Sequence, residues 1–141
     1  MKYYARINKQ KDGKYLVEFL DLPGCLTEGK TLAMAIINAE EALSGWLASH
    51  CDRNMNVLDP KTRKGRDFYP ISVDLRVAFA VLLRKVRIKK GLTQNQVASL
   101  LGISQQAYAR MEIPSKTNPS LSTVQKISKA LNTKLEFDLA A

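Results

Sequence analysis

Three side chains able to read DNA bases lie close together in the stretch GISQQAYARME, residues 102–112. They are Gln105, Gln106 and Arg110. A glutamine amide carries a donor and an acceptor in one plane and can bond twice to adenine in the major groove. An arginine guanidinium can do the same to guanine, and each such pair discriminates against the wrong base by about 1–3 kcal/mol. We expect a helix whose outer face carries these three side chains and Ala109. Its expected inner face consists of Ile103, Ala107, Tyr108 and Met111.

Two helix starts in succession would position this outer face. Thr93 and Ser104 are good N-cap residues, because a hydroxyl accepts a hydrogen bond from a free backbone N–H of the first turn. An apolar residue precedes each cap and another lies four positions after it, which is the hydrophobic-staple pattern. Gly102 offers the positive φ needed where the first helix ends, and Ala98 allows the two helices to approach closely. The pattern predicts a helix-turn-helix.

Three further side chains are expected to contact DNA phosphates, which fix the register of a protein on the duplex without reading its sequence. Gln94 lies at the N-terminus of the first helix of the pair, where free backbone N–H groups bind anions. Ser104 is assigned to the same group at the start of the reading helix. Lys116 follows the reading helix and supplies a positive charge.

A preceding helix is predicted in the stretch SVDLRVAFAVLLRKVRIKKG, residues 72–91, and ends at Gly91. Its C-terminal end is basic, which complements the helix dipole, so some of this charge is structural. The apolar side expected to face the core consists of Leu75, Phe79, Leu82, Leu83 and Val86.

Positive charge is concentrated in the second half of the chain. Residues 1–60 carry 7 Lys+Arg and 8 Asp+Glu, a net charge of −1. Residues 61–141 carry 15 Lys+Arg and 5 Asp+Glu, a net charge of +10. This asymmetry indicates that the second half meets a polyanion while the first half has another task. We expect two domains, residues 1–70 and residues 71–141.

The first half shows the pattern of a small sheet with one helix. Apolar residues alternate in KYYARINKQ and KYLVEFL, which predicts two strands joined at Asp12-Gly13. Pro23-Gly24 fits a type II turn and leads to a short third strand at about residues 25–28. Thr31 is the expected N-cap of an amphipathic helix. DFYPIS is a last strand, placed at a sheet edge by Pro70. The fold class is therefore α+β, with a β-β-β-α-β domain followed by an all-α domain.

The stretch GKYLVEFLDLPGCLTEGKTLAMAIINAEEAL, residues 13–43, resembles the HicB antitoxins. It contains their Phe-x-Asp-x-Pro-Gly-Cys turn, followed by Thr-x-Gly-x-Thr and an alanine-rich helix. The resemblance implies a partial ribonuclease-H-like fold that binds a small RNA-cleaving toxin, HicA. The pattern assigns no individual toxin-contacting residue.

The segment from Leu83 to Leu131 resembles the Cro and phage-repressor class of helix-turn-helix domains, in GLTQNQVASLLGISQQAYARME followed by NPSLSTVQKISKALN. The resemblance implies an ion pair between Arg87 and Glu112 that joins the first helix to the end of the reading helix. We therefore interpret both residues as structural. The loop EIPSKTNPS departs from the class, which more often has Glu-x-Gly there.

A final alternation in KLEFDL, residues 134–139, predicts a strand with no partner in its own domain. Because exposed strand edges are usually covered, we expect it to pair across a two-fold axis or to pack on its own helices. A homodimer or a higher even-numbered oligomer would also suit a palindromic operator.

Catalysis, metal binding and a cofactor are not expected. Cys25 and Cys51 lack a metal-ligand spacing and are predicted to be free thiols, and His50 has no neighbouring cluster. A metal-dependent nuclease is a further hypothesis, because ribonuclease-H folds can cleave RNA with metals held by carboxylates. Asp21 lies at a turn, however, and Glu40 and Glu41 are adjacent on a helix, where they point about 100° apart and cannot face one centre together. No stretch is long and apolar enough for a membrane helix or a signal peptide, so we expect a cytoplasmic protein.

The leading hypothesis is an antitoxin of a type II toxin-antitoxin system. It would neutralise a HicA-like, mRNA-cleaving toxin through residues 1–70 and repress its own operon by binding double-stranded operator DNA through residues 71–141. The alternative is a transcriptional repressor whose first domain senses a small ligand.

Overall fold

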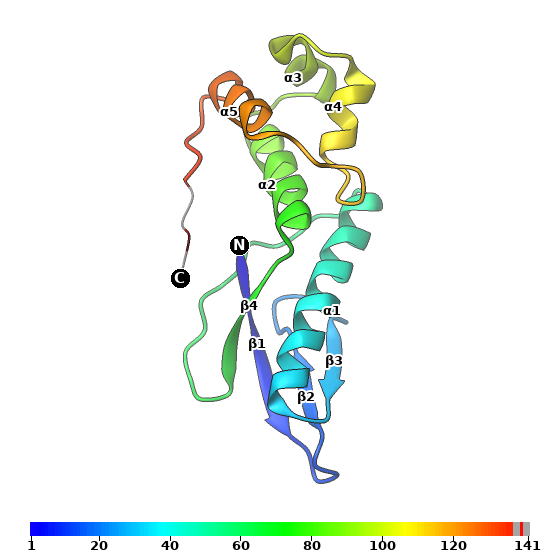
Figure 1. Ribbon diagram of the computed structural model, residues 1–141, viewed down its shortest axis with the longest axis vertical. Coiled ribbons are helices and arrows are strands. Elements are labelled where there is room, and N and C mark those ends of the chain that lie inside the picture. The colour runs from blue at the N-terminus through cyan, green and yellow to red at the C-terminus, as the bar shows by residue number, and fades with distance from the viewer. Residues whose placement is uncertain (137–138, 140–141) are drawn as a thin grey trace. The chain divides into compact units, whose positions relative to one another are not determined.

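The computed structural model describes residues 1–136 and 139, and the chain divides into two compact units. The first unit is Met1–Ala78 and the second is Phe79–Ala141. The sequence places its domain boundary between residues 70 and 71, slightly earlier than the boundary between these units. Figure 1 shows a sheet with a long helix in the first unit and short helices in the second.

The first unit contains a four-stranded antiparallel sheet with the strand order β3-β2-β1-β4. β1 and β2 form a hairpin whose turn contains Gly13 at a φ of 87°. Pro70 lies in β4, an edge strand, where the missing N–H of proline costs the sheet no hydrogen bond on its open side. The strand bounds are β1 Lys2–Lys9, β2 Tyr15–Glu18, β3 Leu26–Gly29 and β4 Phe68–Ser72.

The single helix of this unit, α1 (Leu32–Asp52), packs against the sheet (Figure 1). It begins where the Thr31 hydroxyl accepts a hydrogen bond from the Met34 N–H at 3.1 Å. Gly29 of β3 is required at the closest approach, because a Cβ there would lie 2.3 Å from the backbone nitrogen of Ala35. The residues that α1 buries are Ala35, Ala39, Leu43 and Leu47. The predicted β-β-β-α-β order is confirmed.

The connection between α1 and β4 is held to the body of the first unit by side chains. The Tyr3 hydroxyl donates to the Leu58 carbonyl at 2.7 Å, and Val57 is buried. Arg63 forms an ion pair with Asp21 at 2.6 Å. Residues 61–66 of this connection are mostly exposed, but Arg63 is half-buried through its contact with Asp21.

The second unit consists of helices packed around one apolar core. α2 begins within the last residues of the first unit and is followed by α3, α4 and α5. Their bounds are α2 Leu75–Lys89, α3 Gln94–Leu101, α4 Gln105–Met111 and α5 Leu121–Ala130. The core consists of Leu83, Val97, Ala98, Tyr108, Ile127 and Leu131.

Two expectations about helix faces are wrong. Leu75 and Leu82, expected in the core, are 79% and 45% exposed. They lie seven residues apart and share one face of α2, whereas smaller side chains such as Val81 are buried. Ala107, expected on the inner face of α4, is exposed, because Tyr108 and Met111 fill the inner side of this short helix.

The predicted C-terminal strand lies partly outside the described residues. Residues 134–136 have no regular secondary structure, and the prediction for Phe137 and Asp138 falls on residues that the structure does not describe. None of the described helices is long and apolar enough to cross a bilayer.

Candidate nucleic-acid interface

The outer face of α4 carries Gln105, Gln106 and Arg110, and all three side chains are exposed. The helix starts at Ser104, whose Oγ accepts a hydrogen bond from the Ala107 N–H at 3.1 Å. Tyr108 is fully buried on the opposite side, which fixes the rotation of α4 about its axis. The amides and the guanidinium therefore point away from the core, as a base-reading surface requires.

The turn before α4 sets the angle at which this face is presented. α3 begins with a capping box, in which Thr93 accepts from the Gln96 N–H at 3.1 Å and the Gln96 side chain accepts from the Thr93 N–H at 2.8 Å. α3 ends at Gly102, which has a φ of 67°, and a residue with a Cβ is strained in this conformation. Ala98 is buried in the core that α3 and α4 share. These are the features of a helix-turn-helix.

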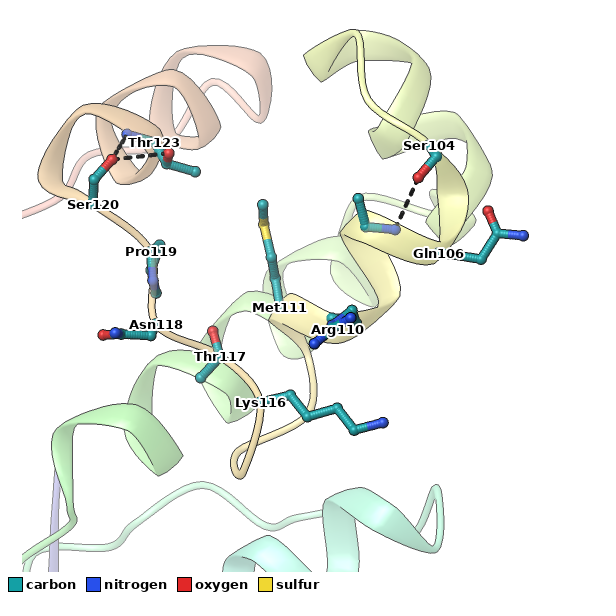
Figure 2. A pocket seen from close by; sticks show the side chains of 11 residues that line it. Ser104, Gln106, Arg110, Met111, Lys116, Thr117, Asn118, Pro119, Ser120 and Thr123 are labelled. Atoms are coloured by element: carbon teal, nitrogen blue, oxygen red, sulfur yellow. Dashed lines mark hydrogen bonds between the residues drawn. The ribbon is translucent and has the colours of Figure 1, made fainter.

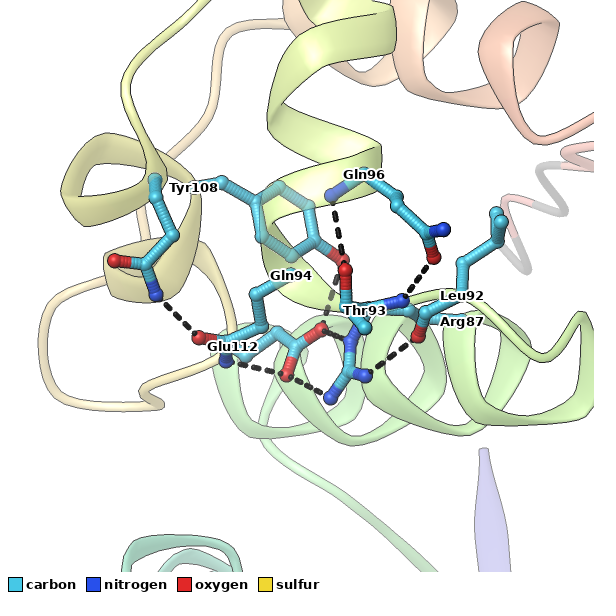
Figure 3. A network of polar contacts seen from close by, with 8 residues as sticks. Arg87, Leu92, Thr93, Gln94, Gln96, Tyr108 and Glu112 are labelled. Atoms are coloured by element: carbon cyan, nitrogen blue, oxygen red, sulfur yellow. Dashed lines mark hydrogen bonds and ion pairs between the residues drawn. The ribbon is translucent and has the colours of Figure 1, made fainter.

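A buried carboxylate ties the end of α4 to α2 (Figure 3). Glu112 is 6% exposed, and its Oε1 accepts from Arg87 Nε at 2.6 Å and from the Tyr108 hydroxyl at 2.8 Å. Its Oε2 accepts from Arg87 Nη2 at 3.1 Å. Arg87 also donates to the Leu92 carbonyl at 2.9 Å, so one guanidinium connects three segments of the unit.

Glu112 and Arg87 stabilise each other's charged form. Burial alone would raise the pKa of the Glu112 carboxyl, but hydrogen bonds from Arg87, Tyr108 and Gln94 lower the pKa below its ordinary value of 4.5. The same contacts with Glu112 raise the pKa of Arg87. Burial, followed by the bond to Glu112, raises the pKa of Tyr108, so its hydroxyl stays protonated and donates. Glu112 is therefore ionised at neutral pH.

Gln94, expected at a DNA phosphate, forms hydrogen bonds to two other side chains of this unit. Its side chain is half-buried, and its Nε2 donates to Glu112 Oε2 at 3.1 Å. Its Oε1 accepts a hydrogen bond from Gln105 Nε2 at 3.1 Å. The amide keeps one N–H for a phosphate, but it is already part of the network beneath α4. The contact between Gln94 and Gln105 was missed because it depends on the angle between α3 and α4, which spacing alone does not give.

Lys116 lies in the loop after α4 and lines an open groove together with Gln106 and Arg110 (Figure 2). The other wall is formed by the loop and the start of α5, including Asn118 and Thr117. Within the described residues, the buried Thr117 hydroxyl has no hydrogen-bond partner. Neither Thr117 nor Asn118 could be identified from the sequence, because the loop departs from the pattern of its class. The groove brings the cations Arg110 and Lys116 together beside Gln106.

Two family models match the chain in succession. A model of the HicB-like antitoxins of bacterial toxin-antitoxin systems matches residues 3–66, and a helix-turn-helix model matches residues 83–137. The chain is 30% identical to antitoxin HicB of Escherichia coli K12, over 97% of its own length and 98% of that protein. The chain belongs to the HicB antitoxin family. Both resemblances inferred from the sequence are thereby confirmed.

The chain is also similar to HicB proteins of other bacteria. Antitoxin HicB 1 of Photorhabdus laumondii is 27% identical over 99% of this chain and 87% of that protein. The crystal structure of the N-terminal domain of the Burkholderia pseudomallei antitoxin HicB is 25% identical, with a TM-score of 0.46, and covers 53% of this chain and 100% of that one. The HicB and helix-turn-helix families are binding families, typically without enzymatic activity.

The HicB-like unit offers no metal centre among the residues that the structure describes. Asp21, the carboxylate weighed for metal-dependent cleavage, is 8% exposed and accepts a hydrogen bond from Arg63 Nη2 at 2.6 Å. Glu40 and Glu41 are exposed on α1.

The cysteines and the histidine of the first unit lie in surroundings that account for them without catalysis. Cys25 and Cys51 are free of disulfides, and burial raises the pKa of the Cys25 thiol to about 11, so it is protonated at neutral pH. His50 stacks on Trp46 with ring centroids 3.4 Å apart, and its Nδ1 lies 2.9 Å from the Trp46 carbonyl oxygen. The stack lies in the second half of α1.

Proposed function

We propose that this chain neutralises an RNA-cleaving, HicA-like toxin through residues 1–70 and represses its own operon through residues 71–141. The observation that carries the proposal is the exposed outer face of α4, with Gln105, Gln106 and Arg110, in a chain whose first part matches the HicB-like antitoxins. One polypeptide would thus combine a protein-binding unit with a DNA-reading unit.

The DNA-binding half of the proposal is supported by charge and geometry. Residues 61–141 carry a net charge of +10, which favours a polyanion. Gln106 and Arg110 carry the donors and acceptors that match adenine and guanine edges, and Lys116 lies beside them for a phosphate. Two copies of α4 in a homodimer, or in a higher even-numbered oligomer, would read half-sites about 34–36 Å apart on one face of the duplex.

The toxin-binding half of the proposal rests on family membership and on the chemistry of the first unit. A net charge of −1 over residues 1–60 suits contact with a basic RNA-cleaving protein better than contact with RNA itself. Asp21 forms an ion pair with Arg63. The proposed mechanism is binding without catalysis and without a cofactor: the antitoxin covers the toxin's catalytic surface.

Co-expression in bacteria tests both halves together. The small open reading frame adjacent to this gene is induced alone, with the full chain, or with a full chain that carries Gln106→Ala and Arg110→Ala. A reporter driven by the operon's own promoter measures repression in the same cells. We expect growth arrest by the neighbour alone, rescue by both chains, and repression by the unaltered chain only.

Each outcome of this experiment separates the alternatives. Growth arrest without rescue by the full chain would reject the antitoxin role. Repression without any toxic neighbour would favour a repressor whose first unit senses a small ligand. Repression by the doubly substituted chain would show that Gln106 and Arg110 of α4 are not needed to read the operator.

A further inference from the structure

We propose that the outer face of α1 is the surface through which this chain contacts the toxin, and that it covers the basic surface with which the toxin binds RNA. The outer face of α1 is defined by Met34, Ile37, Glu41 and Gly45. This inference rests on the proposed toxin-binding function of the first unit. It adds the side of the unit that is used and the chemistry of the surface that this side meets.

The four residues share one side of the helix because they are spaced three or four positions apart. This side is opposite the one that buries residues such as Ala39 and Leu43 against the sheet, so it points away from the sheet (Figure 1). All four residues are exposed. At 1.5 Å per residue, the face extends over about 16 Å, or three turns, which is enough for an element of another protein to pack along it.

Two large apolar side chains lie exposed within one turn of this face. Met34 is 47% exposed and Ile37 is 57% exposed. A groove lined by Gly29, Met34 and Asn38 opens beside them, between α1 and β3. A single exposed apolar residue is ordinary on a protein surface, but two neighbours beside a groove favour contact with another protein. They supply the apolar centre that a protein interface needs.

Gly45 lies in the interior of α1, although the unit itself does not require a glycine there. A Cβ at this position would meet no atom of the described residues within 4 Å. Glycine destabilises the interior of a helix relative to alanine, so its presence calls for a reason. A partner whose backbone packs directly against α1 supplies that reason, because the absence of a side chain permits the close approach.

The charge of α1 indicates the kind of partner. The helix contains Glu40, Glu41 and Asp52 and neither lysine nor arginine, in a chain whose net charge is +9. A protein that binds and cuts RNA needs lysine and arginine side chains to contact the phosphates. Such a surface is complementary in charge to α1, whereas RNA itself is repelled. The carboxylates of α1 would therefore occupy the place of phosphates on the toxin.

A pair of charge reversals tests this surface. The affinity of the full chain for the protein encoded by the adjacent small open reading frame is measured by titration calorimetry at physiological salt. Glu41→Lys and Glu40→Lys are the same change at neighbouring exposed positions that point about 100° apart, and only Glu41 lies on the outer face. We expect Glu41→Lys to weaken binding at least about tenfold, and Glu40→Lys less than about threefold, because salt screens charges away from the contact.

Two further variants test the packing on this face. Gly45→Gln adds a side chain where the unit has free space, and glutamine is the better helix former, so the first unit should resist denaturant better. The same variant should bind the toxin about 10–100-fold more weakly, because the added side chain separates the two surfaces. Ile37→Gln should weaken binding about tenfold. Ser122→Gln, at an exposed position of α5 in the second unit, is the matched control and should leave the affinity unchanged.

Equal losses from Glu41→Lys and Glu40→Lys, or unchanged toxin affinity in Gly45→Gln, would overturn the proposal. Unchanged toxin affinity with a smaller mass of the free chain in Gly45→Gln, measured by light scattering, would assign the face to a second copy of this chain. If Gly45→Gln does not fold, the comparison of Glu41→Lys with Glu40→Lys decides. Failure of the unaltered chain to bind the neighbouring gene's product would instead reject the toxin-binding function itself.

Discussion

Among the described residues, each unit holds a buried carboxylate paired with an arginine, and the two carboxylates differ in how many hydrogen bonds they accept. Glu112 in the second unit accepts four hydrogen bonds, from Arg87, Tyr108 and Gln94. Asp21 in the first unit accepts a hydrogen bond from Arg63 at its Oδ1, and within the described residues its Oδ2 and the Arg63 Nε have no partner. Both pairs have a contact of 2.6 Å, so distance alone does not distinguish them.

The difference shows what each pair does for its unit. Glu112 joins the ends of helices in the middle of a packed core, where an incomplete set of bonds would be costly. Arg63 lies in the long connection between α1 and β4, with its side chain 31% exposed and its guanidinium 5.9 Å from the Phe68 ring centroid. The Asp21 pair fastens a loop to a turn, whereas the Glu112 pair organises a domain and the surface that it presents.

The largest effect is expected from Glu112→Ala. The substitution leaves the buried Arg87 guanidinium without its counter-ion, which typically costs about 3–5 kcal/mol of stability. Amide hydrogen exchange of α3 and α4 measures the free energy of opening of the second unit separately from the first. An unchanged exchange rate in those helices would show that the pair contributes little to the domain.

A smaller loss is expected from Asp21→Ala, about 1.5–3 kcal/mol, the usual value for a hydrogen bond to a charged group. The effect should be confined to the first unit, where the fluorescence of Trp46 reports denaturant unfolding. Amide exchange in α3 and α4 is the control and should not change. A loss larger than that of Glu112→Ala would reverse the comparison between the two pairs.

Lowering the pH should weaken the second unit through Glu112. Because the folded-state pKa of this carboxyl lies below its ordinary value of 4.5, its contribution to stability is complete above pH 4.5. The contribution is lost as the pH falls through the folded-state pKa. Amide hydrogen exchange of α3 and α4, measured from pH 6 downward, tests this prediction. In Glu112→Gln the loss of stability that comes from protonation of this carboxyl should be missing. An identical pH profile for the two chains would contradict the assignment.

The smallest expected effect is that of Lys116→Ala. Loss of one phosphate contact should weaken binding to all DNA sequences about equally and reduce the slope of log affinity against log salt by about 1. Filter binding with operator and random duplexes at several salt concentrations measures both quantities. A loss confined to the operator would instead place Lys116 at a base.

The elements of both units follow from local chemistry that the sequence displays. Thr31, Thr93 and Ser104 cap their helices, and Pro70 lies in an edge strand, because caps and proline act through their immediate neighbours. The faces of α2 were harder to predict, since Leu75 is large and apolar yet exposed, while Ala80 is small and buried. Burial there depends on packing partners distant in the sequence.

In the candidate site, too, some features follow from local sequence and others depend on contacts between distant residues. Exposure of Gln105, Gln106 and Arg110 follows from the staple between Ile103 and Tyr108, which rotates α4. The engagement of Gln94 could not be predicted from its position at a helix start, because it depends on where Glu112 lies in space.

The proposal that α4 reads DNA is tested most directly by the operator preferences of Gln106→Ala. Selection from randomised half-sites is compared for the unaltered chain and the variant, together with their affinity for random duplex. The account predicts that one base pair of each half-site loses its preference, by about 1–3 kcal/mol, while affinity for random DNA stays the same. Equal losses on operator and random DNA would contradict it.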